Sequence, residues 1–159
     1  MIKTKGMKTG QYFALFTGIL LIALGLLGFI PGIQHPVNFV ENHDGIDIQV
    51  SYLFGLIPTN PTFNLLRLSL GVLGLVGSIG LGGARIFARG VFFSYLIFAA
   101  LGMIPSFDTF FGLIPLYGSN VAFHAVFAAL GFYFGFIESP GLLEIAAEPP
   151  EGAVPVNKQ

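Results

Sequence analysis

Arg67 and His124 are the side chains whose type and position point most directly to chemistry, because each lies inside a long apolar segment. An ionisable residue within a membrane span is costly and marks a candidate functional site. For Arg67, the alternative is that its long stem lets the guanidinium reach the outer membrane interface. His124 has the chemistry of a single axial ligand for a haem or pigment, or of a proton carrier. The alternative for His124 is a structural histidine that is hydrogen-bonded to a neighbouring helix.

Polar residues also gather where the same two apolar segments begin: Asn60, Asn64, Ser119 and Asn120. Asn and Ser at such positions are most often helix N-caps. With Arg67 and His124 they form a candidate polar pocket, which two inward-pointing helix N-termini would make favourable for an anion. Asp108 is the nearest acid on that side in chain terms. We expect Arg67 to pair with Asp108, with backbone carbonyls or with a bound anion.

The composition places these residues in a membrane protein. The chain has 159 residues, of which 54% are hydrophobic and 9% charged, with a mean hydropathy of +0.82. Ordinary globular domains are about 25% charged. The absence of cysteine excludes disulfides, thiolate metal sites and thiol redox chemistry. A net charge of −1 without a large basic patch argues against nucleic acid as a partner.

Four apolar segments predict four transmembrane helices, at about 12–33, 63–81, 87–104 and 121–137. The last three are near the lower limit of the roughly 17–25 residues that a span requires. The first segment exceeds the apolar stretch of a signal peptide, and no small-residue cleavage motif follows it, so we expect a retained helix.

The basic residues predict the orientation. Those near the segments are Lys3, Lys5, Lys8, Arg85 and Arg89. The first three lie in the N-terminal stretch 1–11, and the two arginines lie in the expected loop between the second and third segments. The other two connections contain neither Lys nor Arg. The positive-inside rule then makes both termini cytoplasmic.

The chain contains a duplicated phrase. Phe54-Gly55-Leu56-Ile57-Pro58 recurs as Phe111-Gly112-Leu113-Ile114-Pro115, and the same register aligns Arg67 with His124. We therefore expect an all-α bundle of two helix-pair repeats, 12–81 and 88–137. Equivalent helices point in the same direction, which predicts a parallel repeat about an axis along the membrane normal.

Two further regions lie outside the apolar segments. The outer connection 34–52 contains Asp-Gly between alternating residues, which predicts a β-hairpin. It contains potential ligands: His35, Glu41, His43, Asp44 and Asp47. They show no recurring metal-ligand spacing, so a solvated acidic hairpin is the favoured interpretation. The stretch 138–159 is rich in Pro and acids and predicts a cytoplasmic, largely disordered tail, with a short turn at 142–145.

Glycines recur within the apolar segments: Gly71, Gly74, Gly77, Gly80, Gly131 and Gly135. Small residues let membrane helices approach closely. We expect them to serve packing within the chain, and self-association through these faces is the alternative.

The sequence resembles a family of small four-helix bacterial membrane proteins, found in cyanobacteria and actinobacteria, that is classed as a domain of unknown function. The resemblance covers roughly 12–137 and is carried by Ala-Leu-Gly-Leu-Leu-Gly-Phe-Ile-Pro at 23–31, Tyr-Leu-Phe-Gly-Leu-Ile-Pro-Thr-Asn at 52–60 and Phe-His-Ala at 123–125. Family members usually read Asn-x2-His-Asn-x2-His where this chain has Asn60, Phe63, Asn64 and Arg67. A family site built on those histidines would be lost or altered here. The resemblance implies the fold and a bacterial cytoplasmic membrane, or a thylakoid membrane in a cyanobacterium, and implies no activity.

Three functions stay open. The first is a non-catalytic accessory subunit or assembly factor of a larger membrane complex, which the small size and the lack of a catalytic constellation favour. The second is a small oligomeric transporter or channel, although the spans contain no acidic residues. The third is an enzyme or cofactor carrier that uses Arg67 and His124. The pattern favours a protein that is not an enzyme; no metal and no particular cofactor is predicted, and the lipid bilayer is the one partner that follows directly.

Overall fold

The structure is a computed structural model that describes residues 6–41 and 47–146. Its elements are α1 (Thr9–Leu27), β1 (Gln34–Glu41), β2 (Asp47–Leu53), β3 (Ile57–Thr59), α2 (Pro61–Gly77), α3 (Leu81–Gly102), α4 (Ser119–Phe132), the π-helix η1 (Tyr133–Ile137) and α5 (Leu142–Ala146). The chain is therefore mostly helical, with one small sheet.

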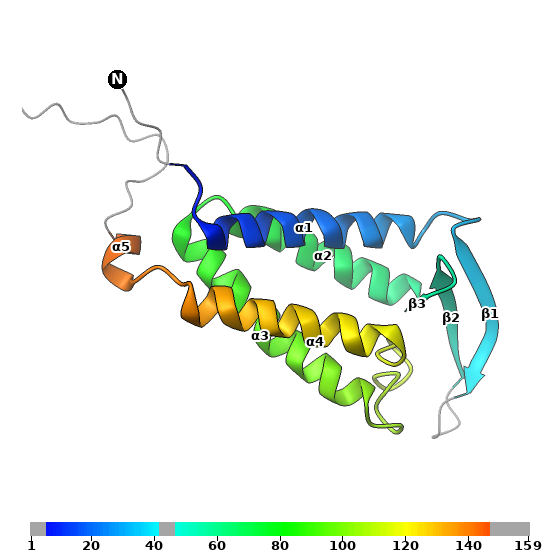
Figure 1. Ribbon diagram of the computed structural model, residues 1–159. Coiled ribbons are helices and arrows are strands. Elements are labelled where there is room, and N and C mark those ends of the chain that lie inside the picture. Colours follow the sequence, from blue (N-terminus) through cyan, green and yellow to red (C-terminus); the bar gives the residue numbers. More distant parts are fainter. Residues whose placement is uncertain (1–5, 42–46, 147–159) are drawn as a thin grey trace, which may run out of the picture.

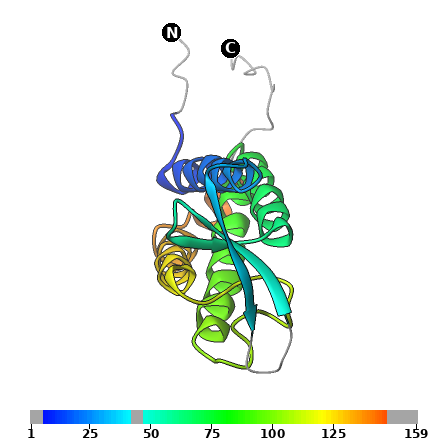
Figure 2. The same cartoon turned by 90° about the vertical axis from the view of Figure 1, so that its right-hand side faces the viewer.

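The helices α1 to α4 lie side by side and alternate in direction, and η1 continues α4 (Figure 1). The sheet lies across one end of the bundle, next to the 103–118 connection, and we call this the sheet end (Figures 1 and 2). The start of α1, the α2–α3 turn and α5 lie at the opposite end, the α5 end. The helix α1 packs mainly against α2, and α3 packs mainly against α4.

Three helical segments are long and apolar enough to cross a membrane: Thr9–Leu27, Leu81–Gly102 and Ser119–Ile137. The helix α2 is also apolar but shorter, with 17 residues. Large apolar side chains face outward, such as Phe16 at 65% exposure, Ile86 at 73% and Val76 at 60%. An apolar surface of this kind suits lipid rather than water. These features are those of a membrane protein, as the composition predicts.

The first helix ends earlier than predicted, at Leu27 rather than Ile33. The carbonyl of Gly28 accepts hydrogen bonds from the side chains of Asn64 and Gln34. Carbonyls at a helix end need partners, and here other elements supply them. The chain therefore leaves the helix at Gly28 and turns into β1.

The third helix begins earlier than predicted, and the assignment of Arg85 and Arg89 to a loop is wrong. Both lie within α3, which begins at Leu81. Arg85 Nη1 donates to the carbonyl of Pro140 at 3.1 Å, and Arg89 Nε donates to the carbonyl of Gly135 at 2.9 Å. Their stems carry the charge to these partners, so a helix beginning at a membrane interface accommodates both residues.

The hairpin predicted for 34–52 is confirmed, and it belongs to a three-stranded sheet of order β1-β2-β3. Antiparallel pairing runs from Gln34↔Leu53 to Glu41↔Asp47, with an irregularity between Val37 and Val40. The predicted turn residues His43, Asp44 and Gly45 lie outside the described residues, as does 147–159 of the tail. The third strand was not predicted; it pairs with β2 through the first Phe-Gly-Leu-Ile-Pro copy.

Glycines bring the paired helices into backbone contact. A Cβ on Gly74 would lie 2.8 Å from Gly18 Cα and 2.9 Å from the carbonyl oxygen of Ala14, both in α1. A Cβ on Gly131 would lie 2.7 Å from the nitrogen of Phe92 and 2.8 Å from the carbonyl oxygen of Ala88, both in α3. Close packing of this kind is what holds helices together in lipid.

Candidate functional site

A group of buried polar residues lies where α2 and α4 meet the sheet. We call it the Arg67 cluster, and its members are Thr59, Asn60, Asn64, Arg67, Asn120 and His124. Each is at most 7% exposed, and Arg67 and His124 are 1% exposed. Buried polar groups are costly unless they find hydrogen-bond partners, so the contacts of each member matter.

Arg67 is held by neutral partners. Its Nη1 donates to Thr59 Oγ1 at 3.0 Å and to Asn64 Oδ1 at 3.5 Å, and its Nη2 donates to Asn120 Oδ1 at 3.3 Å. Its guanidinium also lies over the ring of Phe63, 4.1 Å from the centroid, a favourable cation–π arrangement. Within the described residues, the hydrogen-bond acceptors of Arg67 are therefore all uncharged side-chain oxygens.

The start of α2 follows from its sequence. Asn60 is the N-cap, with its Oδ1 accepting from the nitrogen of Phe63 at 2.8 Å, and Pro61 occupies the first helical turn. The helix then presents Asn64 and Arg67 to the interior. Asn64 Nδ2 donates to the carbonyl of Gly28 at 2.7 Å and so ties α2 to the end of α1.

Asn120 joins the two copies of the repeated phrase. Its Nδ2 donates to the carbonyl of Pro58 at 2.8 Å and to the carbonyl of Pro115 at 2.7 Å, which are the equivalent prolines of the two copies. Two more bonds cross between the copies: Asn60 Nδ2 to the carbonyl of Leu113 at 2.8 Å, and Ser119 Oγ to the carbonyl of Leu56 at 2.7 Å. The two copies therefore lie at the same end of the bundle and contact each other.

His124 is enclosed by aromatic rings. The centroids of Tyr95, Phe98, Phe63 and Phe123 lie 5.2, 5.5, 5.8 and 6.2 Å from that of His124. Its Nδ1 is buried without a hydrogen-bond partner among the described residues. Arg67 and His124 both lie against the ring of Phe63, so the aligned residues of the two copies share one site.

Asp108, the acid expected near Arg67, is placed elsewhere. It lies in the 103–118 connection, where its carbonyl accepts from the nitrogen of Leu116 at 2.7 Å. The pKa of the Tyr117 phenol is raised above its ordinary value, mainly because the group is buried. Tyr52 and the negative charge of Asp108 raise this pKa further. Asp108 is not among the hydrogen-bond partners of Arg67.

Sequence reasoning identified the polar members at the helix starts and missed Thr59, Phe63 and Tyr95. Thr59 and Phe63 contact Arg67 directly, and the ring of Tyr95 packs against His124. Thr and aromatic residues are common in apolar segments, so their types carried no signal. The one available indication is position, since Thr59 precedes the N-cap Asn60 and Phe63 is the residue whose nitrogen that cap binds.

The described residues do not assemble a metal site. In residues 6–41 and 47–146, no three His, Asp or Glu side chains come together in a way that could hold a metal ion. His35, from the outer hairpin, is exposed and distant in sequence from the other described histidine, His124.

Comparison with known proteins gives one match. No curated protein and no solved structure matches this chain. A family model described as "Domain of unknown function (DUF4383)" matches residues 11–137, a range that contains the sheet and every member of the Arg67 cluster. The family resemblance seen in the sequence is thereby confirmed. The chain belongs to DUF4383, a family defined by a domain of unknown function.

Proposed function

We propose that this protein is a non-catalytic four-span membrane protein that serves as an accessory or assembly subunit of a larger membrane complex. The observation that carries the proposal is the closure of the Arg67 cluster. Its amides, the Thr59 hydroxyl and the Nη atoms of Arg67 bind one another and backbone carbonyls of both repeat copies, and Arg67 and His124 are 1% exposed. Arg67 Nε and His124 Nδ1 have no hydrogen-bond partner among the described residues, and both atoms are buried. A site that performs chemistry on a substrate needs access, and this cluster is closed to the outside.

The fourth span of the proposal is α2. Its 17 residues lie at the lower limit of the range for a span, about 17 residues. It lies alongside α1 over most of its length (Figure 1). Its large outward side chains are apolar, with Leu65 at 59% exposure, Leu73 at 58% and Val76 at 60%, and the exposed Ser69 donates its hydroxyl to the carbonyl of Leu65 within the helix. A helix with this surface and these neighbours is best placed in the same lipid layer as α1.

Backbone geometry supports the parallel repeat. In the first copy Phe54 and Gly55 have φ of 53° and 70°, and in the second copy Phe111 and Gly112 have φ of 58° and 80°. A positive φ is rare for a bulky residue such as Phe. Each copy also closes its turn with an equivalent bond, from the nitrogen of Leu56 to the carbonyl of Leu53 and from Leu113 to Phe110. The copies differ just before the turn, where Phe110 has a φ of 45° and the aligned Leu53 ends β2, but the shared Phe-Gly geometry favours a true duplication.

Burial supports it as well. Arg67, Gly71 and Gly74 are buried in α2, and the aligned residues His124, Ala128 and Gly131 are buried in α4. In α1, the buried Phe13, Ala14, Thr17 and Leu21 recur as the buried Phe87, Ala88, Val91 and Tyr95 of α3, in the register that aligns Gly28 with Gly102. Gly74 approaches Ala14 and Gly18 where Gly131 approaches the aligned Ala88 and Phe92. Each helix pair therefore uses the same contact positions.

The alternatives receive less support from the site. A channel requires a connected polar path, and the Arg67 cluster is buried at the sheet end. A metal or haem on His124 would have to displace aromatic rings and would lie close to the fixed positive charge of Arg67. The accessory role fits a bundle with exposed apolar residues at the sheet end, such as Leu56 at 71% and Phe111 at 63%, which offer contact area to another membrane subunit.

The test is purification of the full chain from its native membranes in a mild detergent, followed by mass spectrometry of the material that stays bound. We expect one or a few membrane proteins in constant ratio to this chain. An untagged strain and an unrelated tagged four-span protein serve as controls. A chain that elutes alone and moves solutes across liposomes would make it a transporter, and a visible absorbance band would make it a cofactor carrier; either result contradicts the accessory role.

A further inference from the structure

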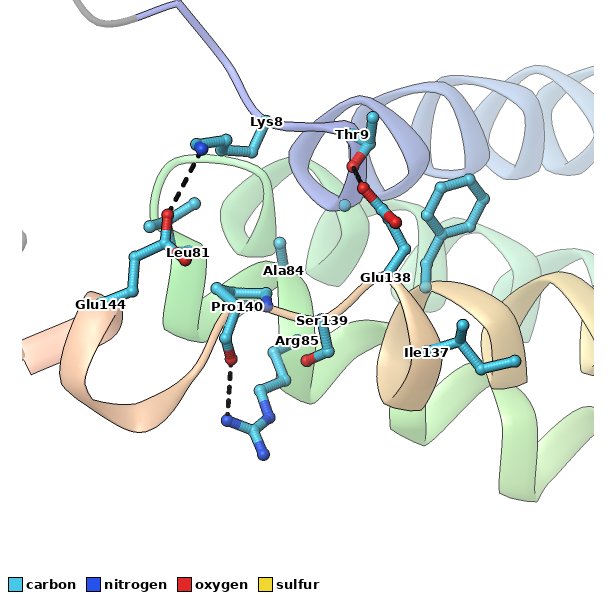
Figure 3. Close-up of a pocket in the computed structure, with 12 residues that line it drawn as sticks. Lys8, Thr9, Leu81, Ala84, Arg85, Ile137, Glu138, Ser139, Pro140 and Glu144 are labelled. Carbon is cyan, nitrogen blue, oxygen red and sulfur yellow. Dashed lines mark hydrogen bonds and ion pairs between the residues drawn. The ribbon is translucent and has the colours of Figure 1, made fainter.

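A cavity at the α5 end is lined by several charged side chains. It has a volume of about 190 Å³ and lies between the start of α1, the first turns of α3 and the segment 138–144 (Figure 3). Water occupies about 30 Å³ per molecule in the liquid, so there is room here for several waters or a small polar group. The ionisable side chains of its lining are two cations, Lys8 and Arg85, and two carboxylates, Glu138 and Glu144.

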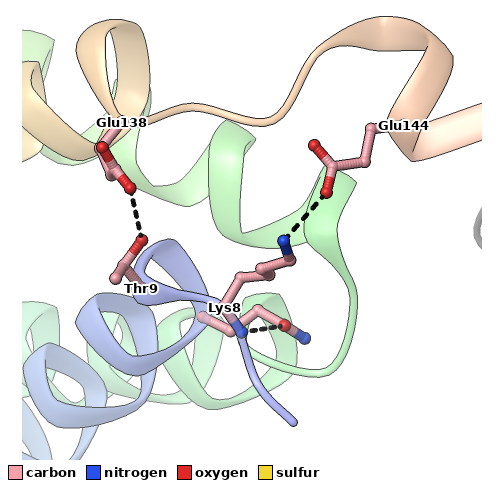
Figure 4. A network of polar contacts seen from close by, with 5 residues as sticks. Lys8, Thr9, Glu138 and Glu144 are labelled. Atoms are coloured by element: carbon pink, nitrogen blue, oxygen red, sulfur yellow. Dashed lines mark hydrogen bonds and ion pairs between the residues drawn. The ribbon is translucent and has the colours of Figure 1, made fainter. Parts of the chain in front are cut away.

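The carboxylates are weakly held. Both come from the segment after η1 and point toward the start of α1 (Figure 4). Glu144 forms an ion pair with Lys8 at 3.3 Å, with side-chain exposures of 39% and 50%, and Thr9 Oγ1 donates to Glu138 at 3.4 Å. Exposed ion pairs add little stability, because water and salt screen them. Glu144 can therefore leave Lys8 when a better anion arrives.

Two polar side-chain atoms of the lining residues have no hydrogen-bond partner among the described residues. They are Arg85 Nε and Ser139 Oγ, and both are buried. Arg85 uses its Nη1 on the carbonyl of Pro140, so the rest of its donor fork remains available. A guanidinium and a hydroxyl are both donors, and phosphate oxygens are the acceptors that match a guanidinium best.

We propose that this cavity binds the phosphate of an anionic phospholipid, which takes the place of Glu144 on Lys8, and that Arg85, on the other side of Pro140 in Figure 3, is the second cation that attracts it. Two cations and two carboxylates balance in the cavity as the structure has it. Once Glu144 has left, one positive charge is uncompensated, which is the charge that a single phosphodiester neutralises. The proposal goes beyond the accessory role and rests on the predicted topology, which puts the α5 end at the cytoplasmic interface, where anionic headgroups concentrate.

The experiment titrates phosphatidylglycerol into the full-length protein in neutral detergent and counts bound lipid by native mass spectrometry. Lys8→Gln and Arg85→Gln should each weaken binding about fivefold, the effect of about one interfacial cation. Glu144→Gln should tighten binding, because it removes the competing carboxylate. Arg89→Gln is the matched control: it removes a cation at the same end that binds Gly135 and packs on Phe136 outside the cavity, and it should leave binding unchanged.

The opposite sign expected for Glu144→Gln separates a ligand site from a structural contact. If Glu144→Gln weakens binding, or if both cation variants bind like wild type, the proposal is overturned. Displacement of the lipid by millimolar inorganic phosphate would reassign the site to free phosphate and overturn the lipid assignment. Neither result depends on which proteins co-purify with the chain, so the accessory role stands or falls separately.

Discussion

The guanidinium of Arg67 donates hydrogen bonds to uncharged side-chain oxygens and not to a carboxylate. Its acceptors come from β3, from α2 and from α4. A buried charge with only neutral partners stays tied to all of them, because none can be given up without leaving the charge less solvated. At the scale of single residues, this makes Arg67 a cross-link between parts that are distant in the chain.

Replacing Arg67 with Leu should lower the free energy of unfolding in mixed micelles by about 1–3 kcal/mol, because three buried oxygens lose a donor. Arg85→Leu should cost less, since that side chain makes one described bond, to Pro140, in a half-buried position. Denaturant titration of both variants measures the difference. Equal stability of Arg67→Leu and wild type would show that the cluster does not hold the bundle.

Replacing Asn120 with Leu should destabilise the protein by about 1–3 kcal/mol, because the carbonyls of Pro58 and Pro115 lose their shared donor. The neighbouring Ser119→Ala removes a bond between the same two copies at an exposed position and should cost well under half as much. Unfolding curves of the two variants under identical conditions provide the comparison. A larger loss in Ser119→Ala would contradict the central place of Asn120.

At this scale the sequence indicated where polar groups lie but not what they bind. The aligned positions of Arg67 and His124 were visible in the repeat, and they do share one site. Their partners were not visible, because Thr59 and Phe63 are residue types that occur anywhere in strands and apolar helices. Asp108, backbone carbonyls and a bound anion are the partners that the sequence suggests for Arg67, whereas the side-chain oxygens of Thr59, Asn64 and Asn120 are the acceptors in the structure.

At the scale of elements, helix existence was predictable and helix ends were not. Apolar length identifies α1 to α4, but it does not identify the start of α3, because Arg85 and Arg89 interrupt the apolar run there. Long basic side chains can stay on a helix at a membrane interface. The Asp-Gly signal predicted the β1–β2 hairpin, but β3 has three residues, too few to leave a pattern.

Gly74→Ala and Gly131→Ala should each cost about 1–3 kcal/mol, and by similar amounts, since each new methyl group would meet backbone of the paired helix. Gly90→Ala is the control: a Cβ there meets nothing within 4 Å, and the change should be neutral or slightly stabilising. Thermal unfolding in detergent ranks the three variants. A harmless Gly131→Ala together with a damaging Gly74→Ala would argue against equivalent helix pairs.

At the scale of the whole molecule, the charge distribution predicts a topology with both termini in the cytoplasm. The chain has no cysteine, so single cysteines at Asp44 and Lys158 report cleanly on their own positions. An impermeant thiol reagent applied to intact cells should label position 44 and spare position 158. The reverse pattern would invert the topology, and labelling of both positions would require an odd number of spans.

The repeat predicts an approximate symmetry for the molecule. An experimental structure should superpose residues 12–81 without the outer hairpin on 88–137, by a rotation of roughly 180° about the membrane normal. The shared turn geometry at Phe54 and Phe111 is the part expected to fit best. A rotation axis lying in the membrane plane would contradict a parallel repeat.

The hydrogen bonds of Asn120 also have a consequence for biogenesis. In the four-span arrangement proposed above, α1 and α2 leave the ribosome before α4, so Arg67 enters the membrane with Thr59 and Asn64 available but without Asn120. The amide that joins Pro58 to Pro115 arrives only with the last span. The first helix pair therefore lacks the hydrogen bonds of Asn120 until α4 is inserted. A truncated chain keeps an incompletely bonded guanidinium in the membrane, a defect that membrane quality control can recognise.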